Sequence, residues 1–331
     1  MNKSRKRIFI AVAVLLVLGI ILSVSLGAVC LTPAQLVNAI KNGSGSGLEG
    51  NIFWYVRVPR TIACLLAGAG LAVSGVVIQS VLSNKLASPG IIGVNAGAGF
   101  AVTVCCALGA LSGWALAGSA FIGALLAVLL VVGAAQKMNA SRTTVILGGV
   151  AVNSFLNAGS EAIITLFPDI GVMSSDFRVG GFTSVTMTRL LPAGILILIG
   201  LCVLFTLCNE LDLMNLGEET AQGLGLPVKK MRTIFLAVAA LLAGASVSFA
   251  GLLGFVGLII PHIARRLVGG ENRHLLPFCA IGGAAFVVLC DLAARLVFQP
   301  YEIPVGILMS FIGGPFFVFL LFKNKGGHRR D

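Results

Sequence analysis

The chain has 331 residues, of which 57% are hydrophobic and only 11% are charged, and its mean hydropathy is +1.03. Soluble domains average roughly 45–50% apolar and about 25% charged residues, so this composition excludes an ordinary soluble protein and indicates a polytopic protein of the lipid bilayer. The formal net charge of +11 would suit a nucleic-acid-binding protein, but the basic residues stand at the ends of apolar runs instead of forming one patch, so we expect no nucleic acid as a partner.

The N-terminus carries a basic cluster, Lys3, Arg5, Lys6 and Arg7, in front of an apolar stretch without charge from Ile8 to Ile40. A secretory signal peptide has an apolar core of only about 7–15 residues. This stretch is too long for such a core, so we predict a retained first membrane span.

Longer charge-free runs must contain more than one span, because a transmembrane helix takes about 20 residues. The run 86–136 is predicted to break at Leu111–Trp114, and the run 233–264 near Gly251 to Gly254, where Ser and Gly interrupt the apolar pattern. The predicted fold class is therefore all-α, a polytopic membrane protein with about ten transmembrane helices in one domain, residues 1–331. The predicted spans are 8–30, 61–82, 91–110, 115–135, 143–166, 190–208, 233–250, 255–267, 275–297 and 304–322, with a hydrophilic loop over 209–232.

Basic residues predict the orientation of these spans. Cytoplasmic segments of membrane proteins carry an excess of Lys and Arg. Ten spans put both termini on one side, and with the N-terminus inside, 17 of the 23 Lys and Arg residues lie in inner segments. We therefore predict cytoplasmic termini. The outer six are Lys41, Arg57, Arg60, Arg178, Arg189 and Arg295.

A short motif, L-A-G-A, occurs at Leu66–Ala69 and again at Leu242–Ala245, in spans that are predicted to run in opposite directions. Inverted repeats are common in transporters. We predict an inverted pseudo-repeat, with a chance match among Ala, Gly and Leu as the alternative.

The eight cysteines lie almost wholly in apolar runs without a C-x-x-C pair, and the three histidines, His262, His274 and His328, are far apart. Buried cysteine behaves as a small hydrophobe. We therefore predict no metal site, no disulfide framework and no cofactor.

The fifth predicted span places Asn153, Asn157 and Ser160 at helical spacing, followed by Glu161. Such a stripe either lines a transport path or hydrogen-bonds a neighbouring helix. Packing is the favoured interpretation.

The hydrophilic loop over 209–232 contains a predicted short helix that begins at Glu218 and Glu219 and stops at Gly225 and Pro227. Acidic residues are favourable near the positive end of a helix dipole. A short capped helix between spans forms a protrusion that suits a cleft in a partner, and a solvated connecting turn is the alternative.

Five segments together resemble the FecCD-type permeases, the iron-chelate and cobalamin branch of ABC importers. The resemblance covers residues 8–322, with departures at Lys85 and at Gly223 that affect only local geometry. The segments are Arg57–Thr61 (R-V-P-R-T), Asn84–Val94 (N-K-L-A-S-P-G-I-I-G-V), Gly254–His262 (G-F-V-G-L-I-I-P-H), Phe311–Phe316 (F-I-G-G-P-F) and the Glu219, Ala221, Gly225 pattern.

This resemblance implies a cobalamin-importer permease-like fold in a bacterial cell membrane. It implies a second permease subunit, identical or paralogous, two cytoplasmic ATPase subunits, and an extracytoplasmic binding protein that is periplasmic or lipid-anchored. It assigns ATPase coupling and binding-protein docking to particular residues, with an intrahelical pair to Asp291 as the alternative for Arg295. The coupling residues are Glu218, Glu219, Ala221 and Gly225, and the docking residues are Arg57, Arg60 and Arg295.

The predicted function is a transport subunit for an iron(III)-siderophore or related chelate, with haem or cobalamin as alternative ligands. The chain contains no G-x-x-x-x-G-K-[ST] phosphate loop, so we expect ATP hydrolysis to be carried out by another polypeptide. An ion-coupled transporter using Glu161 and Asp291 is the alternative, although both lie near outer helix ends instead of at mid-membrane. An intramembrane hydrolase would need a nucleophile and a base on facing helices, and the sequence indicates no such pair.

Overall fold

The computed structural model describes residues 3–27, 29–43, 47–137, 142–297, 299 and 301–325. All regular elements within these residues are helices, which confirms the predicted all-α class. A helix lies at each of the ten predicted spans: α1 (Lys3–Ser25), α4 (Val58–Val81), α5 (Val94–Ala107), α6 (Gly113–Lys137), α7 (Arg142–Leu166), α9 (Met187–Thr206), α12 (Val228–Ala250), α13 (Val256–Val268), α14 (Asn272–Leu296) and α15 (Val305–Lys325).

Six helical stretches within the described residues are long and apolar enough to cross a membrane, and two shorter apolar helices accompany them. The number of ten crossings therefore stays a prediction. Both predicted breaks are present, because α5 ends at Ala107 before α6 begins at Gly113, and α12 ends at Ala250 before α13 begins at Val256. The six long stretches are Arg5–Ser25, Leu48–Val81, Gly113–Ala134, Met187–Thr206, Val228–Ala250 and Asn272–Leu296.

Several short helices lie between the spans. The first span ends at Ser25, earlier than predicted, and α2 (Pro33–Asn42) is a separate helix that starts with a capping box between Thr32 and Gln35. A π-helical turn (Ile52–Arg57) joins α3 (Leu48–Asn51) to α4 without a break. The remaining short helices are α8 (Pro168–Val179), α10 (Cys208–Asn215) and α11 (Glu218–Gly223).

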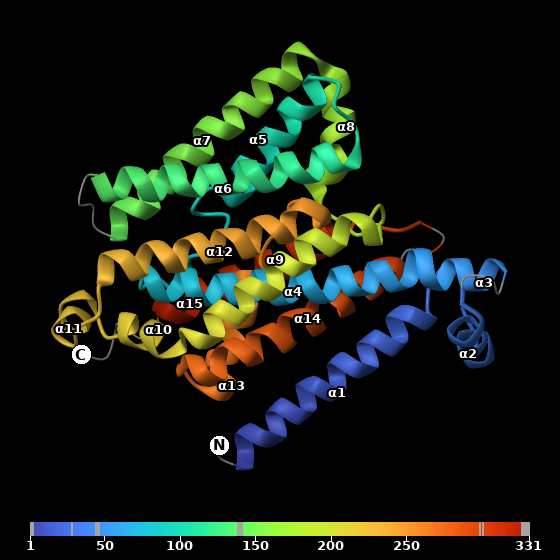
Figure 1. The fold of residues 1–331 in the computed structure, drawn as a ribbon, viewed down its shortest axis with the longest axis horizontal. Helices are drawn as coiled ribbons and strands as arrows, with labels where there is room; N and C mark the ends of the chain where they lie inside the picture. The colour runs from blue at the N-terminus through green and yellow to red at the C-terminus, as the bar shows by residue number, and fades with distance from the viewer. Residues whose placement is uncertain are drawn as a thin grey trace.

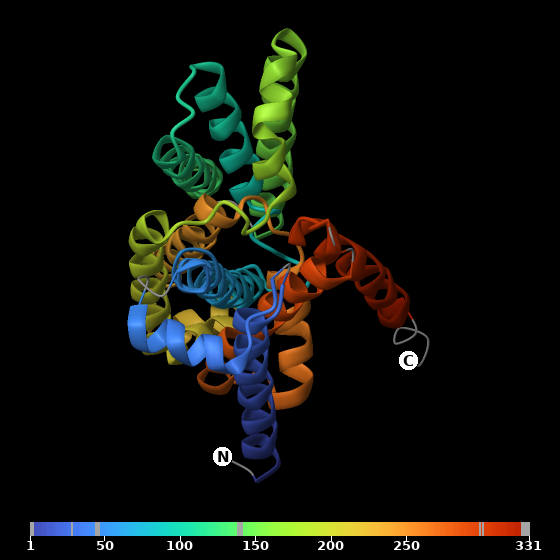
Figure 2. The same ribbon diagram turned by 90° about the vertical axis from the view of Figure 1, so that its right-hand side faces the viewer.

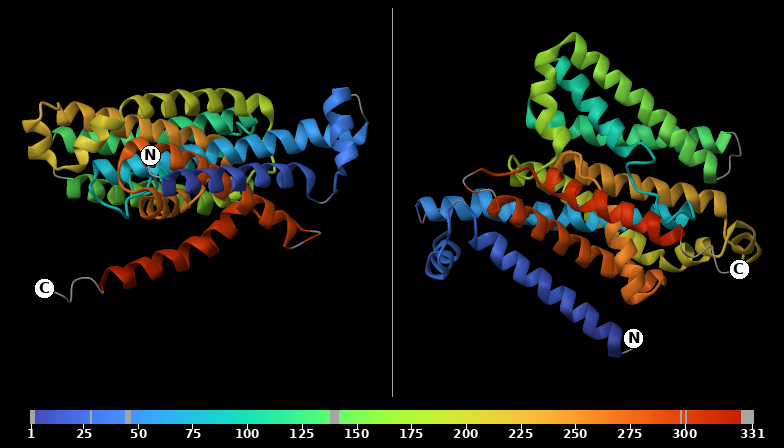
Figure 3. Two further views of the ribbon diagram at one scale, coloured as in Figure 1. Left: turned by 90° about the horizontal axis from the view of Figure 1, so that it is seen from below. Right: turned by 180° about the vertical axis from the view of Figure 1, so that it is seen from behind.

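The helix α4 lies at the centre of the subunit, where α12, α13 and α14 pack around it (Figure 1). It is almost entirely buried, whereas α1 lies at the edge and is mostly exposed. The helices α5 to α8 form a second group on one side of this core, and Figure 2 shows α15 projecting on another side. Seen from below in Figure 3, α15 diverges from the other helices along most of its length.

Small residues allow the central helices to approach closely. A methyl group added at Gly68 of α4 would overlap the backbone of Gly283 in α14, and one added at Gly75 would overlap the backbone of Gly257 in α13. Within a membrane, helices associate through such tight contacts, because lipid tails remove the hydrophobic driving force. The glycines therefore fix the spacing of the core.

We expect Gly75→Ala to lower the free energy of unfolding by about 1–3 kcal/mol, because the added methyl group overpacks the α4–α13 contact. Gly133→Ala on α6 is the matched control, since an added methyl group there meets no atom within 4 Å. Thermal unfolding in one detergent compares the two variants. Equal decreases in Tm would show that this contact does not limit stability.

The two L-A-G-A motifs lie on α4 and α12, which pack side by side and run in opposite directions (Figure 1). The Ser74 hydroxyl of α4 donates a hydrogen bond of 2.8 Å to the Ala239 carbonyl of α12. The antiparallel arrangement agrees with the predicted directions of the two spans. The wider inverted repeat stays a prediction.

The start of α1 and the end of α15 lie toward the same end of the molecule as α10 and α11 (Figures 1 and 3). The opposite end carries α2, α3 and the segment between α14 and α15. We call these the inner end and the outer end. The assignment of the inner end to the cytoplasm stays a prediction.

Candidate functional site

A cluster of buried charges lies at the outer end of the core. It contains three arginines and two carboxylates, and the three arginines are only 6%, 8% and 1% exposed. Buried charges are costly unless they are paired and hydrogen-bonded, so their partners determine what this cluster can do. The members of this outer cluster are Arg57, Arg60, Asp291, Arg295 and Glu302.

Arg60, in the first turn of α4, binds both carboxylates. Its Nε lies 3.1 Å from each oxygen of Asp291, and its Nη2 lies 3.0 Å from Asp291 Oδ1. Its Nη1 donates to Glu302 Oε2 at 2.8 Å. Arginine forms such forked contacts with carboxylates because its guanidinium is planar. Arg60 therefore joins α4 to α14 and to the segment that precedes α15.

Arg295, near the end of α14, ties that helix to α1. Its Nε lies 3.1 Å from Asp291 Oδ2, and its Nη2 donates to Ser23 Oγ at 2.9 Å. Its Nη1 contacts the carbonyls of Ser23 and Leu26 at 3.3 and 3.2 Å. Asp291 thus bridges two arginines while its side chain is 1% exposed.

Arg57 is the last residue of the π-helical turn, a geometry that is frequent at functional sites. Its guanidinium donates to the carbonyls of Leu26 and Val29 at 2.6 and 3.1 Å. Its Nε is buried and has no hydrogen-bond partner among the described residues. With three arginines and two carboxylates, the outer cluster has an excess of one positive charge.

The outer cluster changes the basis of the docking prediction for Arg57, Arg60 and Arg295. The family resemblance implied that these arginines meet a docking protein, but Arg60 and Arg295 already pair with carboxylates of the same subunit. Arg57 binds backbone carbonyls instead. The intrahelical Asp291–Arg295 pair, our alternative, is present and buried. Docking itself stays a prediction. Sequence reasoning missed Glu302, whose signal was a lone acid just before the last span.

The inner end contains the predicted short helix, α11, which runs from Glu218 to Gly223. Glu218 forms an ion pair of 2.8 Å with Arg232 at the start of α12, whereas Glu219 is exposed. Ala221 is fully buried, and Gly225 turns the chain with a φ of +84°. The helix is therefore tied to α12 through Glu218, buries Ala221 and presents Glu219 outward.

Two exposed leucines flank α11, in the loop outside the predicted spans. Leu216 is 58% exposed and Leu224 is 59% exposed. Exposed apolar side chains beside a charged residue are typical of a surface that another protein covers. Sequence reasoning missed them because leucine in a loop is not distinctive.

The helix α10 connects this region to the core. Asp212 accepts hydrogen bonds from the backbone amide and the side-chain amide of Asn272, at 3.0 and 2.8 Å, and so caps α14 from outside. Burial raises the pKa of Asp212, and the hydrogen bonds from Asn272 oppose that rise. The same helix, α14, carries Asp291 and Arg295 at its outer end.

The polar residues along α7 differ in the contacts that they make. Asn153 donates to the carbonyls of Gly90 and Ile91 at 2.8 and 3.3 Å, and Ser160 donates to Leu156 of its own helix at 3.0 Å. Only the Asn153 contact reaches another segment, as the packing interpretation expects, and the choice between packing and path stays a prediction. Asn157 is exposed in the isolated subunit and Glu161 pairs with Arg178, so a role for the exposed face in a path stays a prediction.

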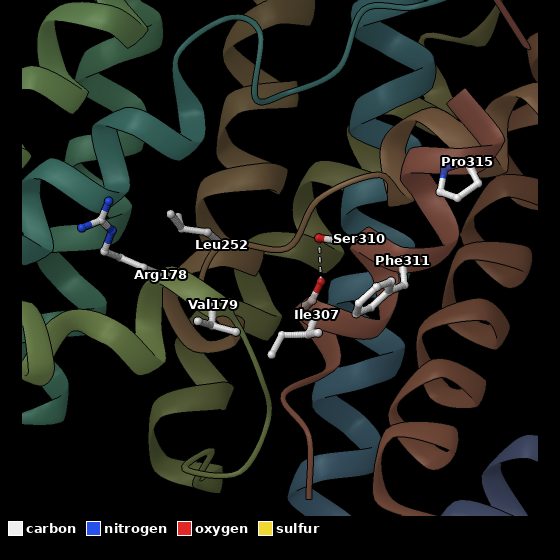
Figure 4. Close-up of a pocket in the computed structure, with 8 residues that line it drawn as sticks. Arg178, Val179, Leu252, Ile307, Ser310, Phe311 and Pro315 are labelled. Atoms are coloured by element: carbon white, nitrogen blue, oxygen red, sulfur yellow. Dashed lines mark hydrogen bonds between the residues drawn. The ribbon is translucent and has the colours of Figure 1, made fainter. Parts of the chain in front are cut away.

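A cavity of about 470 Å³ lies between α8, the segment after α12, and α15 (Figure 4). Arg178 and Val179 come from α8, Leu252 follows α12, and Ile307 and Phe311 come from α15. The Ser310 hydroxyl donates a hydrogen bond of 2.8 Å to the Gly306 carbonyl. Within the described part of the chain, no group of three His, Cys, Asp or Glu residues is arranged to hold a metal ion.

Comparison with known proteins decides the family. The profile of the FecCD transport family matches residues 15–323. The Fe(3+)-citrate import system permease protein YfmE of Bacillus subtilis is 36% identical over 97% of both chains, and the vitamin B12 import system permease protein BtuC of Escherichia coli is 35% identical over the same shares. The chain belongs to the FecCD transport family.

A solved structure extends the likeness of this FecCD permease to three dimensions. An inward-facing putative metal-chelate type ABC transporter matches 96% of this chain and 99% of its own, with a TM-score of 0.87 and 30% identity. The protein is therefore a multi-pass ABC importer permease, a class of subunit that is not itself an enzyme and that works with ATPase partners and a second permease.

Proposed function

We propose that this FecCD permease takes up an iron(III)-siderophore or a related metal chelate. The observation that carries the proposal is its likeness, at a TM-score of 0.87, to a putative metal-chelate type ABC transporter over nearly the whole chain. The relatives differ in the ligand that their names print, iron citrate in one case and vitamin B12 in another. Haem and cobalamin are therefore the alternative ligands.

The proposed assembly contains two permease subunits, identical or paralogous, two cytoplasmic ATPases and an extracytoplasmic solute-binding protein that is periplasmic or lipid-anchored. The inner end faces the cytoplasm of a bacterial cell and the outer end faces the binding protein. Membrane lipid covers the apolar face of α1, where Ile10, Val17 and Ile21 are 62%, 55% and 54% exposed.

ATPase coupling is proposed for α11. The ion pair of Glu218 with Arg232 holds the helix against α12, Ala221 is buried, and the turn at Gly225 leads the chain into α12. Exposed Leu216 and Leu224 supply apolar contact area for an ATPase cleft, with Glu219 between them. Motion of α11 would reach the outer end through α10, the Asp212 cap and α14.

Docking of the binding protein is proposed for the outer cluster, because its excess positive charge attracts acidic side chains. A double replacement of Arg57 and Arg60 by Glu would not test this idea cleanly. It would put two further carboxylates beside Asp291 in a buried environment and unfold the subunit. A test of docking therefore needs a less disruptive substitution, at a partly exposed residue on the edge of the cluster.

The ion-coupled alternative is not favoured. Asp291 accepts from two arginines and is buried, and Glu161 is paired with Arg178 on an exposed surface. Neither carboxylate is placed as an isolated proton site near mid-membrane. Membership of the FecCD family also makes the chain an ABC permease.

Reconstitution tests the proposed function. Proteoliposomes with the permease, its ATPase and its solute-binding protein are expected to accumulate a radiolabelled ferric siderophore only with ATP. Ferric citrate, a ferric hydroxamate, haem and cobalamin are compared as ligands. Omission of the binding protein is the control. Accumulation driven by a proton gradient without ATP would overturn the proposal, and preference for cobalamin would overturn its ligand.

A further inference from the structure

The two carboxylates of the outer cluster differ in access to solvent. The Asp291 side chain is 1% exposed and accepts from both Arg60 and Arg295. The Glu302 side chain is 33% exposed and binds Arg60 alone, through Nη1 at 2.8 Å. Asp291 also belongs to the long helix α14, whereas Glu302 belongs to the segment between α14 and α15. Glu302 is therefore the carboxylate that can leave while the core stays intact.

The arginines differ in access as well. Arg295 is 1% exposed and its donors face Asp291, Ser23 and Leu26. The two terminal nitrogens of Arg57 donate hydrogen bonds to backbone carbonyls. Arg60 holds Asp291 on its buried side through Nε and Nη2, and only Nη1 points to a partly exposed partner. A carboxylate from outside therefore reaches this cluster at the position that Glu302 occupies.

Two observations show that the cluster favours a further acceptor. Three arginines face two carboxylates, so one positive charge is not balanced within the cluster. The Nε of Arg57 is also buried without a hydrogen-bond partner among the described residues, and a buried donor without an acceptor is costly. The unbalanced charge attracts an incoming acidic side chain, which meets Arg60 because the Nε of Arg57 is buried.

We propose that Glu302 is an exchangeable internal carboxylate, which leaves Arg60 when an acidic side chain of the docking protein takes its place. The inference rests on the proposed function, because it needs a binding protein at the outer end. It adds that docking is a competition between two carboxylates for one guanidinium. The internal one reduces the apparent affinity to the intrinsic affinity multiplied by the fraction of time for which Arg60 is free.

The exchange acts on α15. Glu302 lies three residues before this helix, and the backbone amide of Gly306 donates to Gly180 at the end of α8 at 3.2 Å. The same helix contributes Ile307, Ser310 and Phe311 to the wall of the 470 Å³ cavity (Figure 4). Release of Glu302 removes one contact of the segment in front of α15, whereas the bond from the Ile303 amide to the Ala294 carbonyl at 3.3 Å remains. Docking outside therefore loosens the segment that leads into this wall of the cavity.

Two variants test the exchange by affinity for the solute-binding protein, with the assembled transporter in nanodiscs at low ionic strength. Glu302→Gln removes the charge, and Glu302→Asp keeps the charge but shortens the side chain so that it holds Arg60 less well. Both are expected to raise affinity about threefold to tenfold, which corresponds to about 0.7–1.4 kcal/mol. Glu49→Gln is the matched control, since Glu49 lies at the outer end, in α3, and accepts from Gln35.

A nitroxide label reports the movement directly. Tyr301, which is 79% exposed, is replaced by Cys in a background where exposed Cys30 and Cys202 are Ser. The label is expected to become more mobile when the binding protein docks and in Glu302→Gln without it. If the wild type docks and both Glu302 variants have unchanged or lower affinity for the binding protein, the exchange alone is overturned. A rise in affinity no larger than that of Glu49→Gln also overturns the exchange. Absence of docking in the wild type overturns the proposed function as well.

Discussion

Replacement of Asp291 by alanine is expected to lower the free energy of unfolding by about 3–5 kcal/mol, the cost of removing one partner from a buried ion pair. Two buried arginines share this carboxylate, and Arg295 has no other carboxylate within ion-pair distance among the described residues. The variant would leave Arg295 with only neutral acceptors on α1. Loss of yield in the membrane and a large decrease in Tm in detergent are the measurements.

Asp169→Ala is the matched control for this variant, because Asp169 is exposed at the start of α8. Its effect is expected to stay within about 1 kcal/mol, the usual value of an acidic residue near a helix N-terminus. A decrease in Tm for Asp291→Ala that is no larger than that of the control would show that the outer cluster is not a major source of stability. Arg295→Met combined with Asp291→Leu is expected to recover part of the loss, because it removes the arginine that Asp291→Ala leaves without a carboxylate, while Arg60 keeps Glu302. Apolar residues of similar volume can replace a buried ion pair.

Replacement of Glu219 by lysine is expected to reduce ATP-driven uptake more than about tenfold while the subunit stays folded and inserted. Glu219 is exposed on α11, whereas the neighbouring Glu218 is engaged with Arg232, so reversal of its charge affects an outside partner and leaves the internal ion pair intact. A like-charge contact in a protein interface costs several kcal/mol. Uptake and ligand-stimulated ATP hydrolysis in proteoliposomes are measured together.

Glu49→Lys makes the same change at the outer end and is expected to leave ATP hydrolysis without ligand unchanged. Glu219→Gln keeps the shape of the side chain and separates loss of the carboxylate from the added positive charge. Normal uptake in Glu219→Lys would remove α11 from the coupling role. Normal thermal stability with lost uptake would locate the defect at the ATPase contact.

Local features of the sequence determined the helical architecture of this protein. Uncharged apolar runs of about 20 residues located ten helices, and Ser or Gly marked the ends of α5 and α12. The acidic pair Glu218–Glu219 and the following Gly225 located α11 within two residues. These signals involve neighbours along the chain, so they can be recognised without the fold. The same reasoning placed the end of the first span too late, because the stretch up to Ile40 contains no charge and the helix start at Thr32-Pro33 was overlooked.

Only the tertiary structure decided which charged side chains pair with one another and which of them are buried. Arg60 and Asp291 are 231 residues apart in sequence, and Arg60 and Glu302 are 242 apart, yet they form one cluster, in which Glu302 alone is partly exposed. The sequence by itself placed Arg57, Arg60 and Arg295 in outer segments, and the family resemblance assigned them to docking. An ion pair depends on distance in space and on burial, and neither follows from hydropathy or spacing. Whether an arginine faces a partner or a carboxylate of its own chain is therefore decided by tertiary packing, here by the close approach of α4 and α14 and by the segment in front of α15.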